Sequence, residues 1–301
     1  MAGNVLVGGG TGFVGNHLCK VLRNKGYGVN VVSRMPGPHH VSWNEINSTG
    51  LPSGTSAVVN LAGQNVMDFR RRWTPGFKQN VFSSRVNTTS ALARAIENAS
   101  VKPKVFVTMS GISGYRPDDD VEYSEDSPIE QFDFFSKLCL NWENAAALDP
   151  VSASKCRTVT VRSGVVLGKH GGMIKQLYLP FFLGLGGPVG DGSQYMPWIH
   201  IHDLAGLITF ALESEHVRGV LNAVAPQVTT NGDFTRAFAR ALKRPAVIPV
   251  PAFVFNLVLG AERAKMVTAG PKVLPKRARA LGYEFSYPTV EAACEAVVKE
   301  A

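Results

Sequence analysis

A glycine-rich segment near the start of the chain carries the residues with the most specific chemical meaning. Directly after the apolar run Asn4–Gly8, the sequence reads Gly9-Gly10-Thr11-Gly12-Phe13-Val14-Gly15. Glycines at positions 9, 12 and 15 would permit a tight turn, a close approach of the backbone to a pyrophosphate, and close helix–strand packing. Free N–H groups at the start of the following helix would face the phosphates. This strand–turn–helix context favours a dinucleotide-binding site over a purely structural turn.

The end of the second predicted strand, Ser33-Arg34, bears on the choice between NAD and NADP. An NAD site usually places an acidic residue about 20 residues beyond the glycines, where it binds the ribose hydroxyls. No acidic residue lies in this neighbourhood. A guanidinium can bind a 2′-phosphate through two hydrogen bonds, and a hydroxyl can add another. Ser33 and Arg34 therefore favour NADP(H), and the structural alternative for Arg34 is a solvated loop position.

The elements that must position these residues alternate in type along the first half of the chain. Short apolar runs, typical of strands buried on both faces of a parallel sheet, occur at Asn4–Gly8, Val29–Ser33, Ala57–Leu61, Val105–Met109 and Thr158–Arg162. Helical spacing of apolar residues occurs at His17–Arg23, Lys78–Asn98 and Phe134–Leu148. This alternation predicts an α/β fold built on a Rossmann-type doubly wound parallel sheet.

The character of the sequence changes after about Gly168, where glycine and proline become frequent. We expect an NADP-binding Rossmann domain over residues 1–168, to which residues 202–225 return with a helix from His202 to Ser214. Residues 169–201 and 226–301 would form a smaller, partly irregular C-terminal domain on the substrate side.

Composition narrows the class of protein. The net charge of +8 suggests attraction to anions, but the basic residues are spread along the chain without an aromatic–basic motif, so we expect no nucleic-acid partner. No apolar run reaches the ~18–20 residues that a membrane helix needs, so we expect no membrane partner. Four cysteines without a CxxC pair predict reduced thiols, and the first strand begins too close to Met1 to leave room for a leader. We expect a soluble intracellular protein in a reducing compartment, cytoplasmic by default, with an organelle or the nucleus left open.

Several longer segments carry a family resemblance. Besides the glycine turn, they are Asn60-Leu61-Ala62-Gly63, Arg162-Ser163-Gly164-Val165-Val166-Leu167-Gly168, Arg72-Trp73, Trp142-Glu143 and Pro197-Trp198-Ile199-His200-Ile201-His202-Asp203-Leu204. With these segments the chain resembles an extended short-chain dehydrogenase/reductase, and more narrowly the atypical, epimerase-like branch called family 39U. The resembling segments span essentially the whole chain.

This resemblance implies further contacts with the cofactor. Leu61 and Ala62 stand where extended enzymes line the adenosine side of the site. Arg85 stands where an asparagine is usual, which would place a second cation near the cofactor. Gly164, Val165 and Val166 would flank the nicotinamide end. Dimers are common in such a family, so a homodimer is a further expectation.

The catalytic pattern departs from the family. Its members use Tyr-x-x-x-Lys, in which a lysine ammonium lowers the pKa of the tyrosine so that it can exchange a proton. None of the seven tyrosines has a lysine four positions later. Alignment on Trp142-Glu143 places Phe135 at the tyrosine position and Cys139 at the lysine position. The usual dyad is absent.

Ser110 and Tyr115 are the remaining catalytic candidates. Ser110 would end the fifth strand, where the family's serine hydrogen-bonds a substrate carbonyl, although it could equally satisfy the backbone. Tyr115, Lys137 and His200 could each replace the missing proton donor, but none has a clear pairing partner in the sequence. His200, His202 and Asp203 offer three metal ligands, yet Asp203 suits the start of a helix and the stretch suits a cleft wall, so we predict no metal site.

Two functions remain open on the sequence alone. The first is an NADP-dependent oxidoreductase or epimerase-like enzyme acting on an unknown small carbonyl or hydroxyl compound, with the cofactor supplying the hydride chemistry. The second is a non-catalytic NADP(H)-binding sensor or scaffold, which the missing dyad favours. The retained glycine turn and the cleft-like region 184–198 favour the enzyme, which we take as the working hypothesis.

Overall fold

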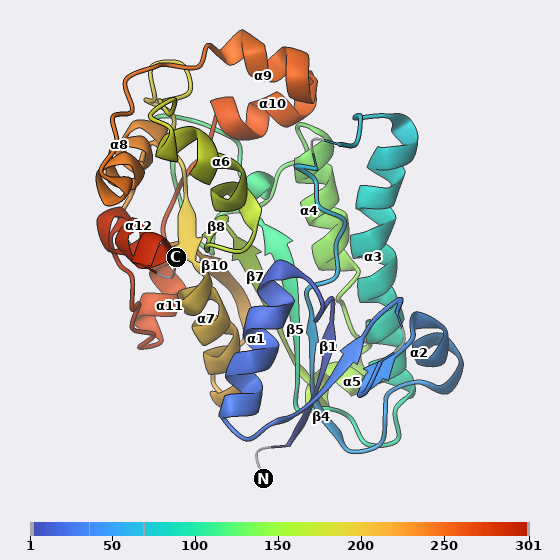
Figure 1. Cartoon of the computed structure of the whole chain (residues 1–301). Helices are drawn as coiled ribbons and strands as arrows, with labels where there is room; N and C mark the ends of the chain where they lie inside the picture. Colours follow the sequence, from blue (N-terminus) through green and yellow to red (C-terminus); the bar gives the residue numbers. More distant parts are fainter. Residues whose placement is uncertain (1–2, 36, 69, 300–301) are drawn as a thin grey trace.

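The centre of the molecule is a seven-stranded parallel sheet (Figure 1). The computed structural model describes residues 3–35, 37–68 and 70–299. The strand order is β10-β7-β5-β4-β1-β2-β3, and every neighbouring pair is parallel. The bounds are β1 Asn4–Gly8, β2 Gly28–Val32, β3 His40–Val41, β4 Thr55–Asn60, β5 Val105–Gly111, β7 Arg157–Ser163 and β10 Gly219–Ala223. The predicted Rossmann-type doubly wound sheet is confirmed.

Helices cover both faces of this sheet, as a doubly wound fold requires. On one face α1 (Phe13–Asn24) and α7 (Ile201–Glu213) lie side by side (Figure 1). The other face carries α2 (Trp43–Thr49), α3 (Pro75–Asn98), α4 (Phe134–Asn144) and α5 (Pro150–Lys155). The direction in which the strands are added reverses between β1 and β4, so a crevice for a ligand is expected at their carboxyl ends.

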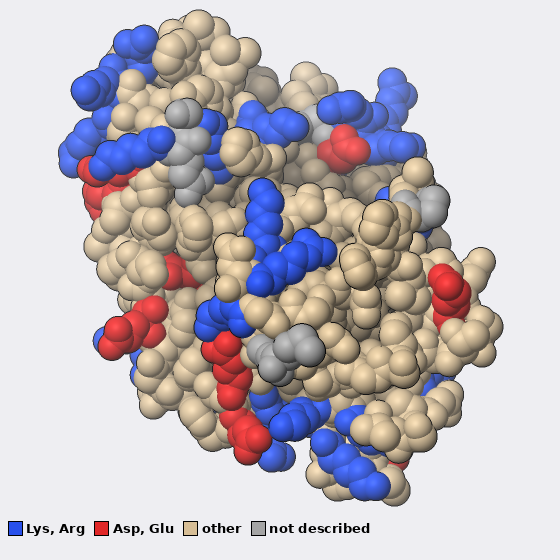
Figure 2. Space-filling view, turned by 60° about the horizontal axis from the view of Figure 1, so that its bottom comes forward, with Lys and Arg blue, Asp and Glu red and all other residues tan. Residues whose placement is uncertain are grey.

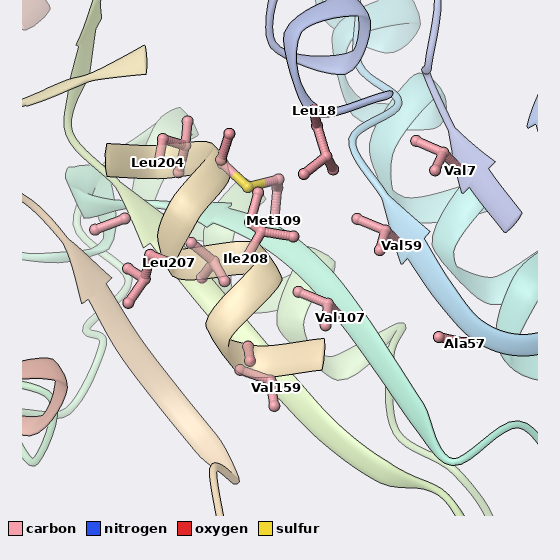
Figure 3. Packing of buried hydrophobic residues seen from close by; sticks show 14 of the residues in the cluster. Val7, Leu18, Ala57, Val59, Val107, Met109, Val159, Leu204, Leu207 and Ile208 are labelled. Carbon is pink, nitrogen blue, oxygen red and sulfur yellow. The ribbon is translucent and has the colours of Figure 1, made fainter. Parts of the chain in front are cut away.

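The sheet core follows the alternation of strand side chains. Val5 and Val7 of β1 join the cluster under α1 and α7, whereas Leu6 joins the cluster under α3. In Figure 3, Leu18 of α1 and Leu204, Leu207 and Ile208 of α7 lie against Val7, Val59, Val107, Met109 and Val159 of four strands. Burial of each such side chain contributes roughly 1.5–3 kcal/mol, so this layer fixes the strand ends that carry the site.

A second cluster of buried residues lies beside the sheet. It includes Leu167, Ile174, Trp198, Phe234, Phe238 and Val290. These residues come from the short parallel pair β8 (Val165–Leu167) and β9 (Trp198–His200), from α6 (Gly172–Phe182) and α8 (Asn231–Leu242), and from α12 (Val290–Lys299). This core supports the part of the chain that follows the sheet's carboxyl edge.

The remaining elements of the C-terminal third are short. They are α9 (Ala252–Leu259), α10 (Ala261–Thr268), β11 (Lys272–Val273) and α11 (Lys276–Ala280). Strand β11 pairs with β6 (Glu122–Tyr123), which lies in the first half of the chain, as does the 3₁₀ turn η1 (Ile112–Gly114) that follows β5. In Figure 1, α9 and α10 lie beyond the carboxyl ends of the strands, above α6 and α4. They are therefore placed to contact the loops of the expected crevice.

Two local signals explain where the fourth helix differs from its predicted range. The sequence predicts a helix over Phe134–Leu148, but α4 ends at Asn144 and a separate α5 begins at Pro150. The Asp149 side chain accepts hydrogen bonds from the N–H groups of Val151 and Ser152, which starts the new helix. An Asp-Pro pair is a helix-start signal, so the chain breaks before it.

The cysteines and the surface charge agree with their sequence patterns. All four cysteines are buried free thiols. On the face drawn in Figure 2, the Lys and Arg side chains form several separate groups interrupted by uncharged surface. Within the described ranges, no helix is long and apolar enough to cross a membrane.

Candidate functional site

The glycine turn joins β1 to α1 in a geometry that leaves no room for a side chain at Gly9 or Gly15. Gly9 has a φ of +74°, and a Cβ atom there would lie 2.7 Å from the backbone nitrogen of Ala62. A Cβ on Gly15 would lie 2.2 Å from the Gly9 carbonyl oxygen. The first turn of α1 has no side-chain cap at Gly12 and no acidic residue. Its N–H groups therefore remain available to an anion, as a pyrophosphate site requires.

The end of β4 lies directly beside this turn. The Leu61 N–H donates to the Gly8 carbonyl at 2.8 Å, and the Ala62 N–H donates to Asn60 Oδ1 at 3.1 Å. Asn60 is fully buried, and its Nδ2 donates to Thr89 Oγ1 at 2.8 Å. Thr89 thus joins β4 to α3, and the structure brings Leu61 and Ala62 to the glycine turn.

Ser33 and Arg34 follow β2 on the other side of β1. Ser33 is buried, and its hydroxyl accepts a hydrogen bond from the Met35 N–H at 3.0 Å. Arg34 is exposed and lines a cavity of about 440 Å³ together with Gln64, Arg71, Phe77, Asn80, Ser83, Ser84 and Asn87. No carboxylate is among these lining residues, so the cavity offers cations and amide or hydroxyl groups to a ligand.

Arg85 of α3 places a positive charge beneath the segment that follows β4. Its Nη1 donates to the carbonyl oxygens of Gln64 at 3.0 Å and Val81 at 3.1 Å. The guanidinium lies against Gly63, where an added Cβ would be 3.0 Å from Cζ, and over the Trp142 ring at 5.2 Å. Desolvation lowers the pKa of Arg85 to about 10, so it keeps its charge at neutral pH. In the described part of the chain no carboxylate pairs with it.

The end of β5 places Ser110 against α4. Ser110 is 3% exposed, and its Oγ has no hydrogen-bond partner in the described chain apart from a weak contact with the Cys139 thiol. A Cβ on Gly111 would lie 3.4 Å from Cys139 Sγ, which places α4 tightly on the strand. Burial raises the pKa of Cys139 to about 11, so the thiol is neutral.

Phe135, at the position where the resemblance expects a tyrosine, lies in an aromatic cluster. Its ring stacks on Trp73 with centroids 5.6 Å apart and planes inclined by 25°. Trp73 also contacts Phe77 and Phe134 edge to face. The wall of α4 beside Ser110 is therefore apolar.

Tyr115 belongs to a buried hydrogen-bond network. It is 1% exposed and belongs to a cluster with Val224 and Val273. Its hydroxyl contacts Arg162 Nη1 at 2.7 Å, Asn222 Oδ1 at 3.0 Å and the Ser124 carbonyl at 2.9 Å. Burial raises the pKa of Tyr115. The structure thus gives Tyr115 a full set of hydrogen bonds, none of them with Ser110, although its partner Arg162 stands beside Ser110 in the pairing of β5 with β7.

The partner of Tyr115 belongs to a buried ion pair that sequence reasoning missed. Arg162 Nε and Nη2 donate to the two carboxylate oxygens of Glu143, each at 2.8 Å. This bidentate pair joins α4 to β7, and Arg162 then reaches Tyr115. Glu143 and Arg162 lie in segments that carry the resemblance, Trp142-Glu143 and Arg162–Gly168. Their spacing in the sequence, however, does not predict an ion pair.

Gly164, Val165 and Val166 follow β7 on the far side of the crevice. A Cβ on Gly164 would lie 2.6 Å from the Pro197 carbonyl oxygen, and Val165 and Val166 pair with Trp198 and Ile199 of β9. The Phe13 ring of the glycine turn packs on Gly168, Gly171 and Gly172 just beyond. The structure therefore brings this segment to the same edge of the sheet as the glycine turn.

The histidine stretch forms a structural cluster. His200 is fully buried and caps α7, with its Nδ1 accepting from the His202 N–H at 3.3 Å. Burial and two neighbouring histidines lower the pKa of His200 to about 3. Asp203 accepts hydrogen bonds from the N–H groups of Ser286 at 2.7 Å and Tyr287 at 2.9 Å. Among the residues that the structure describes, no group of His, Cys, Asp and Glu could hold a metal ion.

Comparison with known proteins identifies the family. Residues 5–223 match the NAD dependent epimerase/dehydratase family. Residues 250–297 match a domain of unknown function, DUF1731. The chain belongs to the NAD dependent epimerase/dehydratase family, which confirms the family resemblance of its motifs.

Within this family the chain is similar to proteins called SDR39U1. The Bos taurus epimerase family protein SDR39U1 is 50% identical over 295 residues, which cover 98% of this chain and 99% of that protein. The crystal structure of human epimerase family protein SDR39U1 (isoform 2) with NADPH is 49% identical and has a TM-score of 0.96, covering 99% of this chain and all of that one. A nucleoside-diphosphate sugar epimerase from Corynebacterium glutamicum is 28% identical with a TM-score of 0.77, covering 97% of this chain and 57% of that one.

Proposed function

We propose that the chain binds NADP(H) and transfers hydride between it and a small carbonyl or hydroxyl compound. The observation that carries the proposal is the glycine turn at the reversal of strand order, with an uncapped helix N-terminus facing the crevice. The human relative, whose crystal structure is described as being with NADPH, supports this choice of cofactor.

The residues around the crevice fit the parts of such a cofactor. The first turn of α1 would bind the diphosphate through backbone N–H groups, without an acidic side chain to repel it. Ser33 and Arg34 would bind the 2′-phosphate, and Leu61 and Ala62 would contact the adenosine. The nicotinamide end would lie between Ser110 and the segment Gly164, Val165 and Val166.

Ser110 is the residue that we infer to hold the substrate oxygen. Leaving a buried hydroxyl without a partner costs roughly 1–3 kcal/mol, and a carbonyl oxygen in the crevice would supply the missing hydrogen bond. The hydroxyl would donate to that oxygen and polarise the carbonyl. Its position at the end of β5 is fixed by the packing of Cys139 on Gly111.

Charge and proton supply differ from those of an enzyme with a Tyr-x-x-x-Lys dyad. Arg85 would provide the positive charge that the lysine usually provides, since its guanidinium interacts electrostatically with Cys139, the residue at the lysine position. The bound cofactor would supply the hydride. In the reducing direction the proton would reach the substrate oxygen from solvent water. Phe135, at the position of the usual tyrosine, has no ionisable proton, and the Cys139 thiol is buried.

We infer that neither Tyr115 nor Lys137 replaces the missing tyrosine. Tyr115 is committed to Arg162, Asn222 and Ser124 in a closed network. Lys137 is exposed, two positions along α4 from Phe135 and Cys139, which places it on a different face of the helix.

A second candidate function is a non-catalytic NADP(H) sensor or scaffold. The observation that favours it is the stacking of Trp73 on Phe135, which makes the wall beside Ser110 apolar. With this second function the cofactor would bind at the same glycine turn, and α4 would supply no proton donor because none is needed for a reaction.

Turnover on a carbonyl panel separates these two functions. Purified protein would be mixed with NADPH and a panel of aldehydes and ketones, and cofactor oxidation followed by absorbance. We expect oxidation by the wild type that Ser110→Ala lowers at least ~100-fold, the scale of losing one positioned hydrogen-bond donor. Ser113→Ala, in the neighbouring 3₁₀ turn, is the matched control and should keep the wild-type rate.

Two results would contradict the enzyme proposal. One is tight NADPH binding by the wild type with no oxidation of the cofactor across the panel, which supports the sensor. The other is equal turnover by wild type and Ser110→Ala, which removes Ser110 from the reaction.

A further inference from the structure

The loop between β4 and α3, which the structure describes over residues 61–68 and 70–74, is held in place by a buried arginine of the C-terminal third. Arg263 is only 2% exposed. Its Nη1 lies 3.5 Å from the carbonyl oxygen of Val66, 3.3 Å from that of Asp68 and 3.2 Å from that of Arg71. A single guanidinium that faces three carbonyls of one loop fixes the path of its backbone.

The residue before Arg263 holds the other end of the same loop. Glu262 accepts a hydrogen bond from Trp73 Nε1 at 2.5 Å and pairs with Lys78 Nζ at 2.6 Å. The Arg263 guanidinium lies over the Trp73 ring at 5.3 Å from its centroid. The start of α10 therefore joins the loop and α3 into one arrangement.

The path of the loop determines where Arg71 lies. Its exposed side chain lines the same cavity of about 440 Å³ as Arg34, which follows β2. Asn80, Ser83 and Asn87 of α3 line it as well, and no acidic residue does. Two guanidinium groups with nearby amides and hydroxyls form a suitable environment for a phosphate monoester.

We propose that Arg71 is a second ligand of the cofactor's 2′-phosphate, and that Arg263 is a positioning residue through which the C-terminal segment sets the preference for NADP(H). Arg34 alone would leave the preference to one solvated side chain. The loop adds a second guanidinium to the lining of the same cavity, and Arg263 fixes the backbone that carries it. The inference rests on the cofactor binding proposed above, but it needs no catalytic turnover.

The first experiment measures the ligand role of Arg71. Dissociation constants for NADPH and NADH would be obtained by fluorescence titration of wild type, Arg71→Ala and the control Arg72→Ala, whose exposed side chain is not among the cavity's lining residues. Because hydrogen bonds to charged groups are worth ~1.5–3 kcal/mol, Arg71→Ala should weaken NADPH binding about tenfold or more. NADH binding should change by less than about twofold, as both should for Arg72→Ala.

The second experiment measures the positioning role of Arg263. Arg263→Met keeps an unbranched apolar side chain at this position but removes the guanidinium and its contacts with the three carbonyls. We expect about fivefold weaker NADPH binding with NADH unchanged, and faster hydrogen exchange of residues 64–68 and 70–73 in the cofactor-free protein. Arg71→Ala combined with Arg263→Met should bind NADPH no more weakly than Arg71→Ala alone, because both act through one side chain.

The outcomes are separable from those of the proposed function. Wild type that binds neither nucleotide, or both equally, would contradict the NADP(H) proposal itself. Arg71→Ala with an unchanged ratio of NADPH to NADH affinity would overturn its ligand role. Faster exchange in Arg263→Met with an unchanged ratio would overturn the positioning role. If Arg263→Met does not fold, Arg263→Lys keeps the charge but faces fewer carbonyls, and the same two readouts apply.

Discussion

Two groups of polar side chains lie a short way apart along the carboxyl edge of the sheet, and they differ in how their hydrogen bonds are used. Around the glycine turn the groups are open, since the α1 N-terminus has no cap, Arg34 is exposed and the Ser110 hydroxyl has no strong partner. Around β7 the groups are closed, because Arg162 forms a bidentate pair with Glu143 and reaches Tyr115.

This difference separates groups that bind a ligand from groups that hold the fold. A buried polar group left open costs stability, so its retention suggests that a ligand completes it. A group that is fully paired within the protein has no capacity left for a substrate. On this reasoning we assign Ser110 to the proposed cofactor site and Tyr115 to the framework.

The largest effect on stability should come from the closed group. Arg162→Met leaves the Glu143 carboxylate and the Tyr115 hydroxyl without their donor, so the free energy of unfolding should fall by about 3–5 kcal/mol. Urea denaturation measures this change. Arg236→Met breaks an exposed pair with Asp233 and should cost no more than ~1 kcal/mol. Loss of NADPH affinity with stability unchanged in Arg162→Met would break the comparison.

The open group should show the reverse behaviour. Gly15→Ala places a Cβ atom 2.2 Å from the Gly9 carbonyl oxygen, which forces the turn away from its anion-binding shape. We expect about 100-fold weaker binding of both NADPH and NADH, or ~2.7 kcal/mol. Gly76→Ala is the matched control, since its Cβ would meet no atom within 4 Å. Unchanged affinity in Gly15→Ala, measured by fluorescence titration, would remove the turn from the cofactor site.

The buried His200 should make the free energy of unfolding depend on pH. Its folded-state pKa of about 3 lies below the ordinary value of 6.5, so the unfolded chain takes up the proton first and stability falls as the pH drops below 6.5. Between pH 7 and 5 the loss should be about 2 kcal/mol. His17 and His202 face this ring, so the comparison is with His200→Asn, which keeps both.

Urea denaturation at several pH values measures this pH dependence of the free energy of unfolding. The slope of stability against pH should be shallower in His200→Asn than in the wild type. The exposed His216→Asn should keep the wild-type slope. Equal slopes for wild type and His200→Asn would mean that the folded protein accommodates a charged His200.

The smallest effect should distinguish two buried serines. Ser110→Ala removes a hydroxyl without a strong partner and should raise the free energy of unfolding by about 1 kcal/mol. Ser136→Ala removes a hydroxyl that accepts from the Phe132 and Asp133 N–H groups and should lower it by a similar ~1 kcal/mol. A loss of stability in Ser110→Ala would place its hydroxyl in the framework.

The open group could largely be predicted from the sequence. The glycine spacing and Ser33-Arg34 depend on residues close together in the chain, and the carboxyl ends of parallel strands necessarily meet at one edge. The structure accordingly brings Leu61, Ser110 and Gly164 to the edge that carries the glycine turn.

The closed group and the loop contacts could not be predicted in the same way. Arg263 faces carbonyls 192 to 197 residues away, and Arg277 and Glu125 meet across 152 residues. Such contacts depend on how the C-terminal elements pack, which no local period encodes. Arg70-Arg71-Arg72 is visible as a short basic run, but only the fold distinguishes Arg71 from its neighbours.

The buried cysteines make the protein a natural subject for thiol-labelling kinetics. Burial raises the pKa of Cys139 to about 11 and that of Cys294 to about 12, so neither thiol reacts appreciably with an aromatic disulfide reagent while its surroundings stay closed. Cys139 lies between α4 and the sheet, and Cys294 lies in the second core with α8 and α12. The order in which the two become reactive in rising denaturant would reveal whether the two cores open as one cooperative unit or in succession.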